Sequence, residues 1–176
     1  CHQSNGNEHP KPGMIAFSLV KKVPDLCFTC HNDIKKNIDS LSVVHQPVNQ
    51  DKYCLNCHTS HSSDEKKLLI AKKNDLCLSC HNKPIITTTR TLTNIDQLLK
   101  NNKVIHPPIK TGCTACHNAH ASANNNLLIN YFPDGEYVMP VRKDSFALCF
   151  GCHDSKLLNY DTTTIATKFR NGQKRS

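Results

Sequence analysis

Ten of the eleven cysteines form pairs separated by two residues, and a histidine directly follows the second cysteine of every pair. Two thiols at this spacing can add across the vinyl groups at one edge of a porphyrin, while the following imidazole binds the iron. The five copies of this word therefore predict five covalent c-type haems. Their thioether residues would be Cys27, Cys30, Cys54, Cys57, Cys77, Cys80, Cys113, Cys116, Cys149 and Cys152.

Other uses of paired cysteines fit these words less well. A zinc site uses two cysteine pairs for one metal ion and has no need of a histidine after each pair. Five pairs would also leave one pair over. A disulfide framework does not need the repeated histidine either. We therefore interpret all five words as haem sites.

The eleven histidines nearly match the demand of five six-coordinate irons. The histidines that end the words are the predicted proximal ligands: His31, His58, His81, His117 and His153. Five more histidines would be needed as distal ligands on the opposite faces. The predicted distal ligands are His45, His61, His106, His120 and His9, which leaves His2 over.

The distal ligands are expected to cross between haems. His61 lies three residues after His58 and cannot reach round to the opposite face of the same iron, so it should bind a neighbouring haem. The repeat described below extends this reasoning to the other histidines. The expected assignments are His61 to the haem on Cys27, His45 to that on Cys54, His120 to that on Cys77 and His106 to that on Cys113.

The words are organised as a repeat. Each unit has an opening word, a histidine in the middle of the loop, and a closing word of the form Cys-x-x-Cys-His-x-x-His. We expect a five-haem domain over 25–153, preceded by an N-terminal arm that supplies a distal ligand and followed by a C-terminal arm. The expected segments are 1–24 for the first arm, 25–70 and 75–129 for the two complete units, 145–153 for an open unit, and 154–176 for the second arm.

Composition predicts a fold with little regular structure. The chain has six Phe, four Tyr and no Trp, so a core made by protein alone would be thin. We therefore expect a mostly irregular chain with short α-helices wrapped around a haem stack and little β-structure. Local signals predict a helix that begins at Pro24-Asp25, a short helix over 93–101 with Thr93 and Asp96 as a capping box, and a β-hairpin near 127–141.

Charge and hydropathy narrow the class further. The formal net charge is +8, and the roughly ten propionate charges of five haems would largely offset it. The basic residues are scattered, without interleaved aromatic residues, so nucleic-acid binding is not expected. No apolar run is long enough to cross a bilayer.

The two ends of the chain raise open alternatives. Cys1-His2 may be read as the end of a preceding closing word, as an acylated N-terminus that anchors the protein to a membrane, or as a free or singly haem-linked thiol. The haem on Cys149 has no histidine downstream, so its distal ligand should be His9 or else His2. Supplied by a second copy, that ligand would join subunits head to tail into a polymer. A monomer with its N-terminus folded back, or a five-coordinate iron, is the alternative.

The five words and the His58/His61 and His117/His120 pattern resemble the multihaem c-type cytochromes with doubled Cys-x-x-Cys-His units, over about residues 25–153. The resemblance implies electron transfer in the periplasm, across the outer membrane or along extracellular filaments. It also implies haem attachment outside the cytoplasm, so the protein should be exported. In filament-forming members a neighbouring subunit often supplies one axial histidine.

The expected function is therefore electron transfer through a chain of bis-histidine haems, without catalytic residues. We favour an extracellular or cell-surface conduit, as a polymeric wire, that exchanges electrons with redox partner proteins or extracellular acceptors. A soluble periplasmic shuttle is the alternative. A multihaem redox enzyme would need an open iron with acid–base groups beside it, and a haem-storing protein is a third class.

Overall fold

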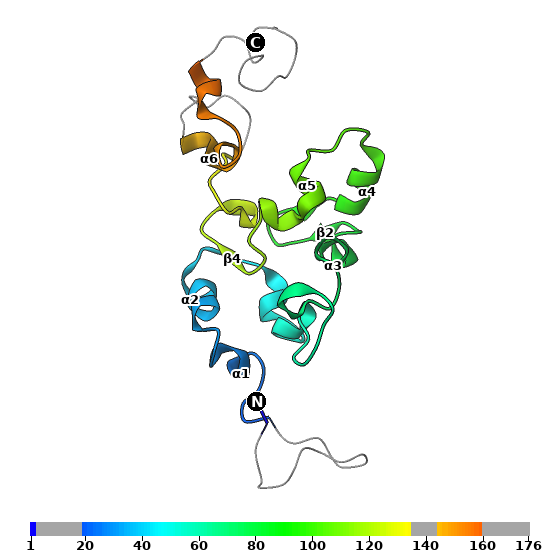
Figure 1. Cartoon of the computed structure of the whole chain (residues 1–176), viewed down its shortest axis with the longest axis vertical. Helices are drawn as coiled ribbons and strands as arrows, with labels where there is room; N and C mark the ends of the chain where they lie inside the picture. Colours follow the sequence, from blue (N-terminus) through cyan, green and yellow to red (C-terminus); the bar gives the residue numbers. More distant parts are fainter. Residues whose placement is uncertain (3–18, 135–143, 160–176) are drawn as a thin grey trace. The chain divides into compact units, whose positions relative to one another are not determined.

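The computed structural model describes residues 1–2, 19–134 and 144–159 (Figure 1). As predicted, these residues are mostly irregular, with short helices and little strand. The α-helices are α1 (Asp25–Phe28), α2 (Asn32–Ser40), α3 (Lys73–Cys80), α4 (Ile95–Asn101), α5 (Pro108–Thr111) and α6 (Ala147–Phe150). Single turns of 3-10 helix lie between them: η1 (Gln46–Asn49), η2 (Tyr53–Asn56), η3 (Lys66–Leu68), η4 (Cys113–Ala115), η5 (Asn125–Leu127), η6 (Asp144–Phe146) and η7 (Ser155–Asn159).

The chain divides into two compact units. The first contains Cys1–Ser40 and His45–Cys113, and the second contains Leu41–Val44 and Thr114–Ser176. The division falls inside the fourth haem word, directly after its first cysteine. The predicted boundaries of the arms and repeat units rest on the positions of the haem words, and they stay predictions.

Each unit holds one two-stranded antiparallel sheet. In the first unit, β2 (Ile85–Ile86) pairs with β3 (Thr91–Leu92) as a short hairpin. In the second unit, β1 (Val43–Val44) pairs with β4 (Ala121–Ser122), with Val43 opposite Ser122 and Val44 opposite Ala121. The pairing of β1 with β4 joins residues far apart in the sequence. It places the middle of the first repeat unit beside the closing loop of the second repeat unit.

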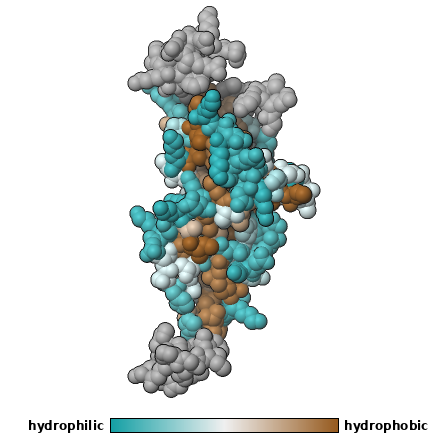
Figure 2. Space-filling model, turned by 90° about the vertical axis from the view of Figure 1, so that its right-hand side faces the viewer, coloured by the Kyte–Doolittle hydropathy of each residue, from teal (hydrophilic) through white to brown (hydrophobic). Residues whose placement is uncertain are grey.

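Very few side chains are buried by protein alone. Among the described residues, only Gly112, Ala121, Ser122 and Leu128 are buried, and no large side chain is fully so. Ile86 and Val104 are 82% and 90% exposed. Figure 2 shows apolar patches at the surface, broken by hydrophilic residues. A chain with so little internal core needs another apolar partner, and a flat porphyrin can supply that surface.

The helix termini follow local signals. Pro24 caps α1, and Asp25 lies in its first turn, as the sequence predicts. For α4 the capping prediction was displaced by one residue: the cap is Asn94, whose side-chain oxygen accepts a hydrogen bond from the N–H of Gln97 (2.9 Å). Asparagine is a better N-cap than threonine, which explains the shift from Thr93.

The hairpin expected over 127–141 is not formed in the part that the structure describes. Leu127 ends the 3-10 turn η5, and residues 131–134 have no strand partner. The second half, 135–141, lies outside the described residues. Leu128 instead bridges to His117, so this apolar run serves the closing haem word and not a strand.

Candidate haem-binding sites

The haem words form single helical turns. Opening words begin within α1, α3 and α6, and closing words within η2 and η4. Two cysteines three residues apart on a helical turn lie on the same face, so both thiols can reach one edge of a porphyrin. The N–H of the histidine donates to the carbonyl oxygen of the first cysteine in four words, at 3.0 Å for His31, 3.0 Å for His58, 3.1 Å for His81 and 2.9 Å for His153.

Hydroxyl residues between the cysteines bind backbone carbonyl groups in two opening words. In α1 the Thr29 hydroxyl donates to the carbonyl oxygen of Leu26 (2.5 Å), and in α3 the Ser79 hydroxyl donates to that of Leu76 (2.7 Å). These hydroxyls bind the preceding helical turn. All eleven cysteines have free thiols, which thioether formation requires.

The proximal histidines of the closing words are oriented by a backbone carbonyl group. Nδ1 of His58 lies 2.8 Å from the carbonyl oxygen of Lys67, and Nδ1 of His117 lies 2.8 Å from that of Asn126. A carbonyl oxygen only accepts hydrogen bonds, so Nδ1 must carry the proton in both rings. The lone pair is therefore on Nε2, the nitrogen left to bind iron.

The carbonyl groups reach these rings because the backbone takes an uncommon conformation. Lys67 and Asn126 have φ angles of 62° and 59°, in the left-handed region that non-glycine residues rarely adopt. The next residues, Leu68 and Leu127, have φ angles of 54° and 58°. The same strained turn thus follows both closing words. Strain repeated at equivalent positions is typical of functional sites.

The two closing loops are braced by matching hydrogen bonds. The Ser63 hydroxyl donates to the carbonyl oxygen of Leu69 (2.5 Å), and the Ser122 hydroxyl donates to that of Leu128 (2.5 Å). Both serine oxygens also accept a hydrogen bond from the backbone N–H two residues later, at 2.9 Å. Bridges join His58 to Leu69 and His117 to Leu128.

Thiols of the opening and closing words of one repeat unit lie in contact. Burial, and next the negative charge of the Cys27 thiolate, raises the pKa of Cys54 from 9.0 to about 11, and the two thiols share a hydrogen bond. Burial and the Cys113 thiolate likewise raise the pKa of Cys77 to about 11, with the same kind of hydrogen bond. The paired words of a unit therefore present their attachment edges to each other.

Neighbouring repeat units are also linked through their cysteines. Burial and then the Cys80 thiolate raise the pKa of Cys57. Burial and then the Cys116 thiolate raise the pKa of Cys149. With the contacts within units, every word is close to the next word along the chain. Haems attached to these thiols would follow one another in chain order.

Asn74 joins an opening word to its closing partner. Its side-chain Nδ2 donates to the carbonyl oxygen of Ile109 (3.1 Å), while its Oδ1 accepts from the N–H of Cys113 (3.2 Å). The Cys113 thiol also lies 3.5 Å from Oδ1. Asn74 is in the first turn of α3, three residues before Cys77, so it fixes the two words in one geometry.

One predicted distal histidine faces a proximal histidine across a gap of iron size. The rings of His45 and His81 are nearly parallel, at 14°, with centres 6.3 Å apart. A metal–imidazole bond is about 2 Å and the ring centre lies about 1 Å beyond the nitrogen, so two imidazoles on one iron have centres about 6 Å apart. The geometry favours His45 as the ligand opposite His81.

This pairing differs from the sequence expectation, which gave His45 to the haem on Cys54 and His120 to that on Cys77. It does support the principle behind that expectation, that distal ligands cross between words. His61, expected on the Cys27 haem, faces His2 instead, with ring centres 6.1 Å apart and an angle of 9°.

The remaining predicted distal ligands are placed as follows. His106 lies just before α5, where its carbonyl oxygen accepts from the N–H of Ile109 (3.0 Å). The N–H of His120, which directly precedes β4, donates to the side-chain oxygen of Asn118 (3.0 Å). His9 lies outside the described residues. Their roles as iron ligands stay predictions.

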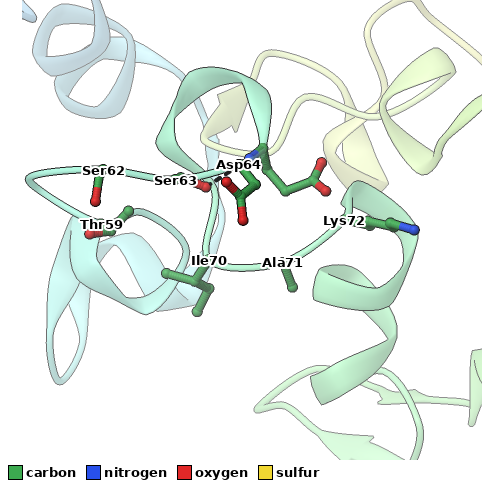
Figure 3. A pocket seen from close by; sticks show the side chains of 8 residues that line it. Thr59, Ser62, Ser63, Asp64, Ile70, Ala71 and Lys72 are labelled. Atoms are coloured by element: carbon green, nitrogen blue, oxygen red, sulfur yellow. Dashed lines mark hydrogen bonds between the residues drawn. The ribbon is translucent and has the colours of Figure 1, made fainter.

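No group of three or more His, Cys, Asp or Glu residues within 1–2, 19–134 and 144–159 is placed to hold a bare metal ion. A haem iron takes only two protein ligands, because the porphyrin supplies four nitrogens. A cavity of about 470 Å³ lies beside the first closing word (Figure 3). It is lined by Thr59, Ser62, Ser63, Asp64, Glu65, Ile70, Ala71 and Lys72, without cysteine or histidine, so it offers no haem ligand.

Sequence reasoning did not find the groups that support the words. The carbonyl groups of Lys67 and Asn126 carry no signal in side-chain chemistry, although Asn126 is of a type that tolerates positive φ. Asn74 acts over 39 residues of sequence, a separation that pattern alone does not bridge. Ser63 and Ser122 could have been found, since they hold the same place in the repeat.

No helix within the described part of the chain has the length and apolar character needed to span a membrane. The doubled CXXCH motif family matches residues 1–36, 45–85 and 106–157, well over half of the chain. No curated protein matches the chain. Family members of this kind bind haem c covalently through their words, and c-type cytochromes are generally exported. The repeated words, their helical turns and this match together show that the chain belongs to the doubled CXXCH motif family of multihaem c-type cytochromes, which take part in electron transfer.

Proposed function

We propose that the chain carries five haems on its five words and passes electrons along them in chain order. The observation that supports this proposal is the closeness of cysteines in successive words, from Cys27 near Cys54 to Cys116 near Cys149. Thioethers at neighbouring thiols would bring successive porphyrin edges together. Short edge-to-edge separations are what electron hopping between haems needs.

Bis-histidine ligation is the second part of the proposal. His31, His58, His81, His117 and His153 bind the irons from one side, and His45 binds the His81 iron from the other. His61, His106, His120 and His9 are the further distal ligands. An iron with both axial positions filled has no place for a substrate, so the protein acts as a carrier and not as a catalyst.

The site of action is proposed to be the cell surface or the extracellular space. A row of haems in chain order can be extended only if another haem protein continues it. A second copy that supplies a histidine to the haem on Cys149 and Cys152 would continue it head to tail, as a polymeric wire. The acceptor would be a redox partner protein or an extracellular oxidant. The alternative is a soluble periplasmic shuttle.

Spectroscopy of the purified protein tests the electron-transfer function. We expect low-spin spectra in both oxidation states, reversible reduction over a broad range of potentials, and no spectral change with carbon monoxide or cyanide at bis-histidine irons. Binding of carbon monoxide by most of the haems, with turnover of a small substrate, would favour a multihaem enzyme and contradict the proposal.

Oligomeric state tests the wire. Size-exclusion chromatography and electron microscopy should find polymers, and removal of the histidine that reaches the Cys149 haem should dissociate them to monomers. His9→Ala is the variant to make, with Asn7→Ala as its neighbouring control. A wild-type protein that is monomeric at all concentrations, with five low-spin haems, would leave the shuttle as the function.

A further inference from the structure

Cys1 and His2 stand outside the five words, yet their backbone is held as the closing words are. His2 forms an isolated antiparallel bridge with Leu19. The N–H of Val20 donates to the carbonyl oxygen of Cys1 at 3.0 Å. The corresponding contacts of the closing words are His58 with Leu69, His117 with Leu128, Ile70 N–H to the Cys57 oxygen (3.0 Å) and Ile129 N–H to the Cys116 oxygen (2.9 Å). Cys1 thus has the position of the second cysteine of a closing word.

The side chain of His2 faces a second imidazole across a gap of iron size. The rings of His2 and His61 are 9° from parallel, and their centres are 6.1 Å apart. The His45–His81 pair has the same arrangement at 14° and 6.3 Å. Both separations fit two imidazoles on one iron, about 6 Å.

The family match divides the chain in the same way. The segment 45–85 holds one closing word and the next opening word, and 106–157 also holds a closing and then an opening word. The segment 1–36 holds only one complete word, the opening word at Cys27. The place of its closing word is taken by Cys1-His2. This observation is independent of the ring geometry.

We infer that Cys1, His2 and His61 form a sixth haem site, with His2 as the proximal and His61 as the distal iron ligand. The inference rests on the proposed function, because it extends the same cofactor to a site outside the five words. The Cys1 thiol adds across a porphyrin vinyl group: the carbon–sulfur bond forms, and the thiol hydrogen goes to the other vinyl carbon. No electrons are lost or gained, so no oxidant is needed.

A sixth haem changes the ligand count. Six irons have twelve axial positions, while the chain has eleven histidines. With His61 used at the His2 iron, at least one position elsewhere must be filled by another donor or stay open. A ligand from a second copy at the Cys149 haem does not change this count, because each copy has the same eleven histidines.

Peptide mapping of the intact holoprotein tests the site. After proteolysis, we expect the Cys1 peptide to carry a haem through a thioether, and the whole protein to contain six haems by pyridine haemochrome assay. Cys1→Ser should lower the count to five and leave the five words loaded. An acyl group on Cys1, or a count of five with an unmodified Cys1 peptide, would overturn the sixth site alone. Words without haem would overturn the proposed function itself.

The distal ligand has a separate test. His61→Ala should let carbon monoxide bind one more iron per chain than in the unmodified protein, and Cys1→Ser in the same protein should abolish that additional binding because the haem is then lost. Ser60→Ala, at the exposed neighbouring position, should bind as much as the unmodified protein. If His61→Ala gives no additional carbon monoxide signal, or one that persists in the double variant, His61 is not the ligand of a haem on Cys1.

Discussion

At the scale of single residues, the closing words owe their geometry to a carbonyl group nine residues away. The carbonyl groups of Lys67 and Asn126 hold Nδ1 of the proximal rings and leave Nε2 for iron. Hydrogen bonds of this kind fix the tautomer and raise the basicity of an axial ligand. The potential of each closing haem should therefore depend on a backbone conformation and not on a side chain.

Lys67 offers a direct test of that dependence. Lys67→Pro cannot adopt a φ of 62°, because proline fixes φ near −65°. The carbonyl group should turn away from His58, and one haem should shift in potential or lose its low-spin spectrum. Lys67→Gly adopts positive φ freely and should leave the spectra unchanged, with a gain of up to about 1 kcal/mol in stability. Equal spectra for the two variants would exclude a role for the carbonyl group.

His45 offers a second test at this scale. His45→Met should raise the potential of the haem on Cys77 and Cys80, since methionine in place of an axial histidine raises it. His45→Ala should open that one iron to carbon monoxide. Gln46→Ala, the exposed next residue, is the matched control. If peptide mapping locates the change in potential on the Cys54 haem instead, His45 is the distal ligand of that haem, as expected from sequence.

At the scale of elements, short braced loops take the place of long helices. β1 and β4 bury Ala121 and Ser122, and the Ser122 hydroxyl ties this pairing to the loop that carries Leu128. The equivalent Ser63 has the same hydrogen bonds but is only half-buried. Burial is thus the main difference between two otherwise matching positions.

We expect the two serines to rank by burial. Ser122→Ala removes one of the two donors to the Leu128 carbonyl group and leaves the half-buried N–H of Asn124 without its acceptor. We expect this to cost about 1–3 kcal/mol of unfolding free energy. Ser63→Ala should cost less, because water can replace the lost partner. Denaturant unfolding followed by haem absorbance measures both. A larger loss for Ser63→Ala would contradict this account of the loops.

Asn74 gives a further prediction for the elements. Asn74→Ala removes the acceptor of the Cys113 N–H and the donor to Ile109, and should destabilise the fold by about 1–3 kcal/mol. Asn101→Ala, at the exposed end of α4, should change stability by less than about 0.5 kcal/mol. Thermal unfolding of the two variants separates these outcomes.

The sequence predicts elements that depend on neighbouring residues better than contacts between residues that are far apart in the chain. The haem words, the start of α1 and the matching closing loops follow from local residue types and spacing. The cap of α4 was missed by one residue, since Thr93 and Asn94 compete for the same role. The closeness of His45 to His81 was not predicted, because long-range contacts, such as the pairing of Val43 with Ser122, are not encoded in local periodicity.

At the scale of the whole molecule, the chain lacks a core of its own. With only four buried residues among those described, the apolar surfaces of the haems must provide most of the burial that stabilises the fold. The haem-free polypeptide should therefore be largely unfolded. Its circular dichroism and hydrogen exchange should be those of an open chain, while the holoprotein is protected. Cooperative thermal unfolding of the haem-free chain would show that the protein folds without its cofactors.

The most direct test of the account is the intact mass of the purified, coloured protein. The polypeptide has a mass of 19.7 kDa, and the account predicts this mass increased by at least five covalently bound haems that survive denaturation. A colourless protein, or one whose denatured mass is that of the polypeptide alone, would contradict it.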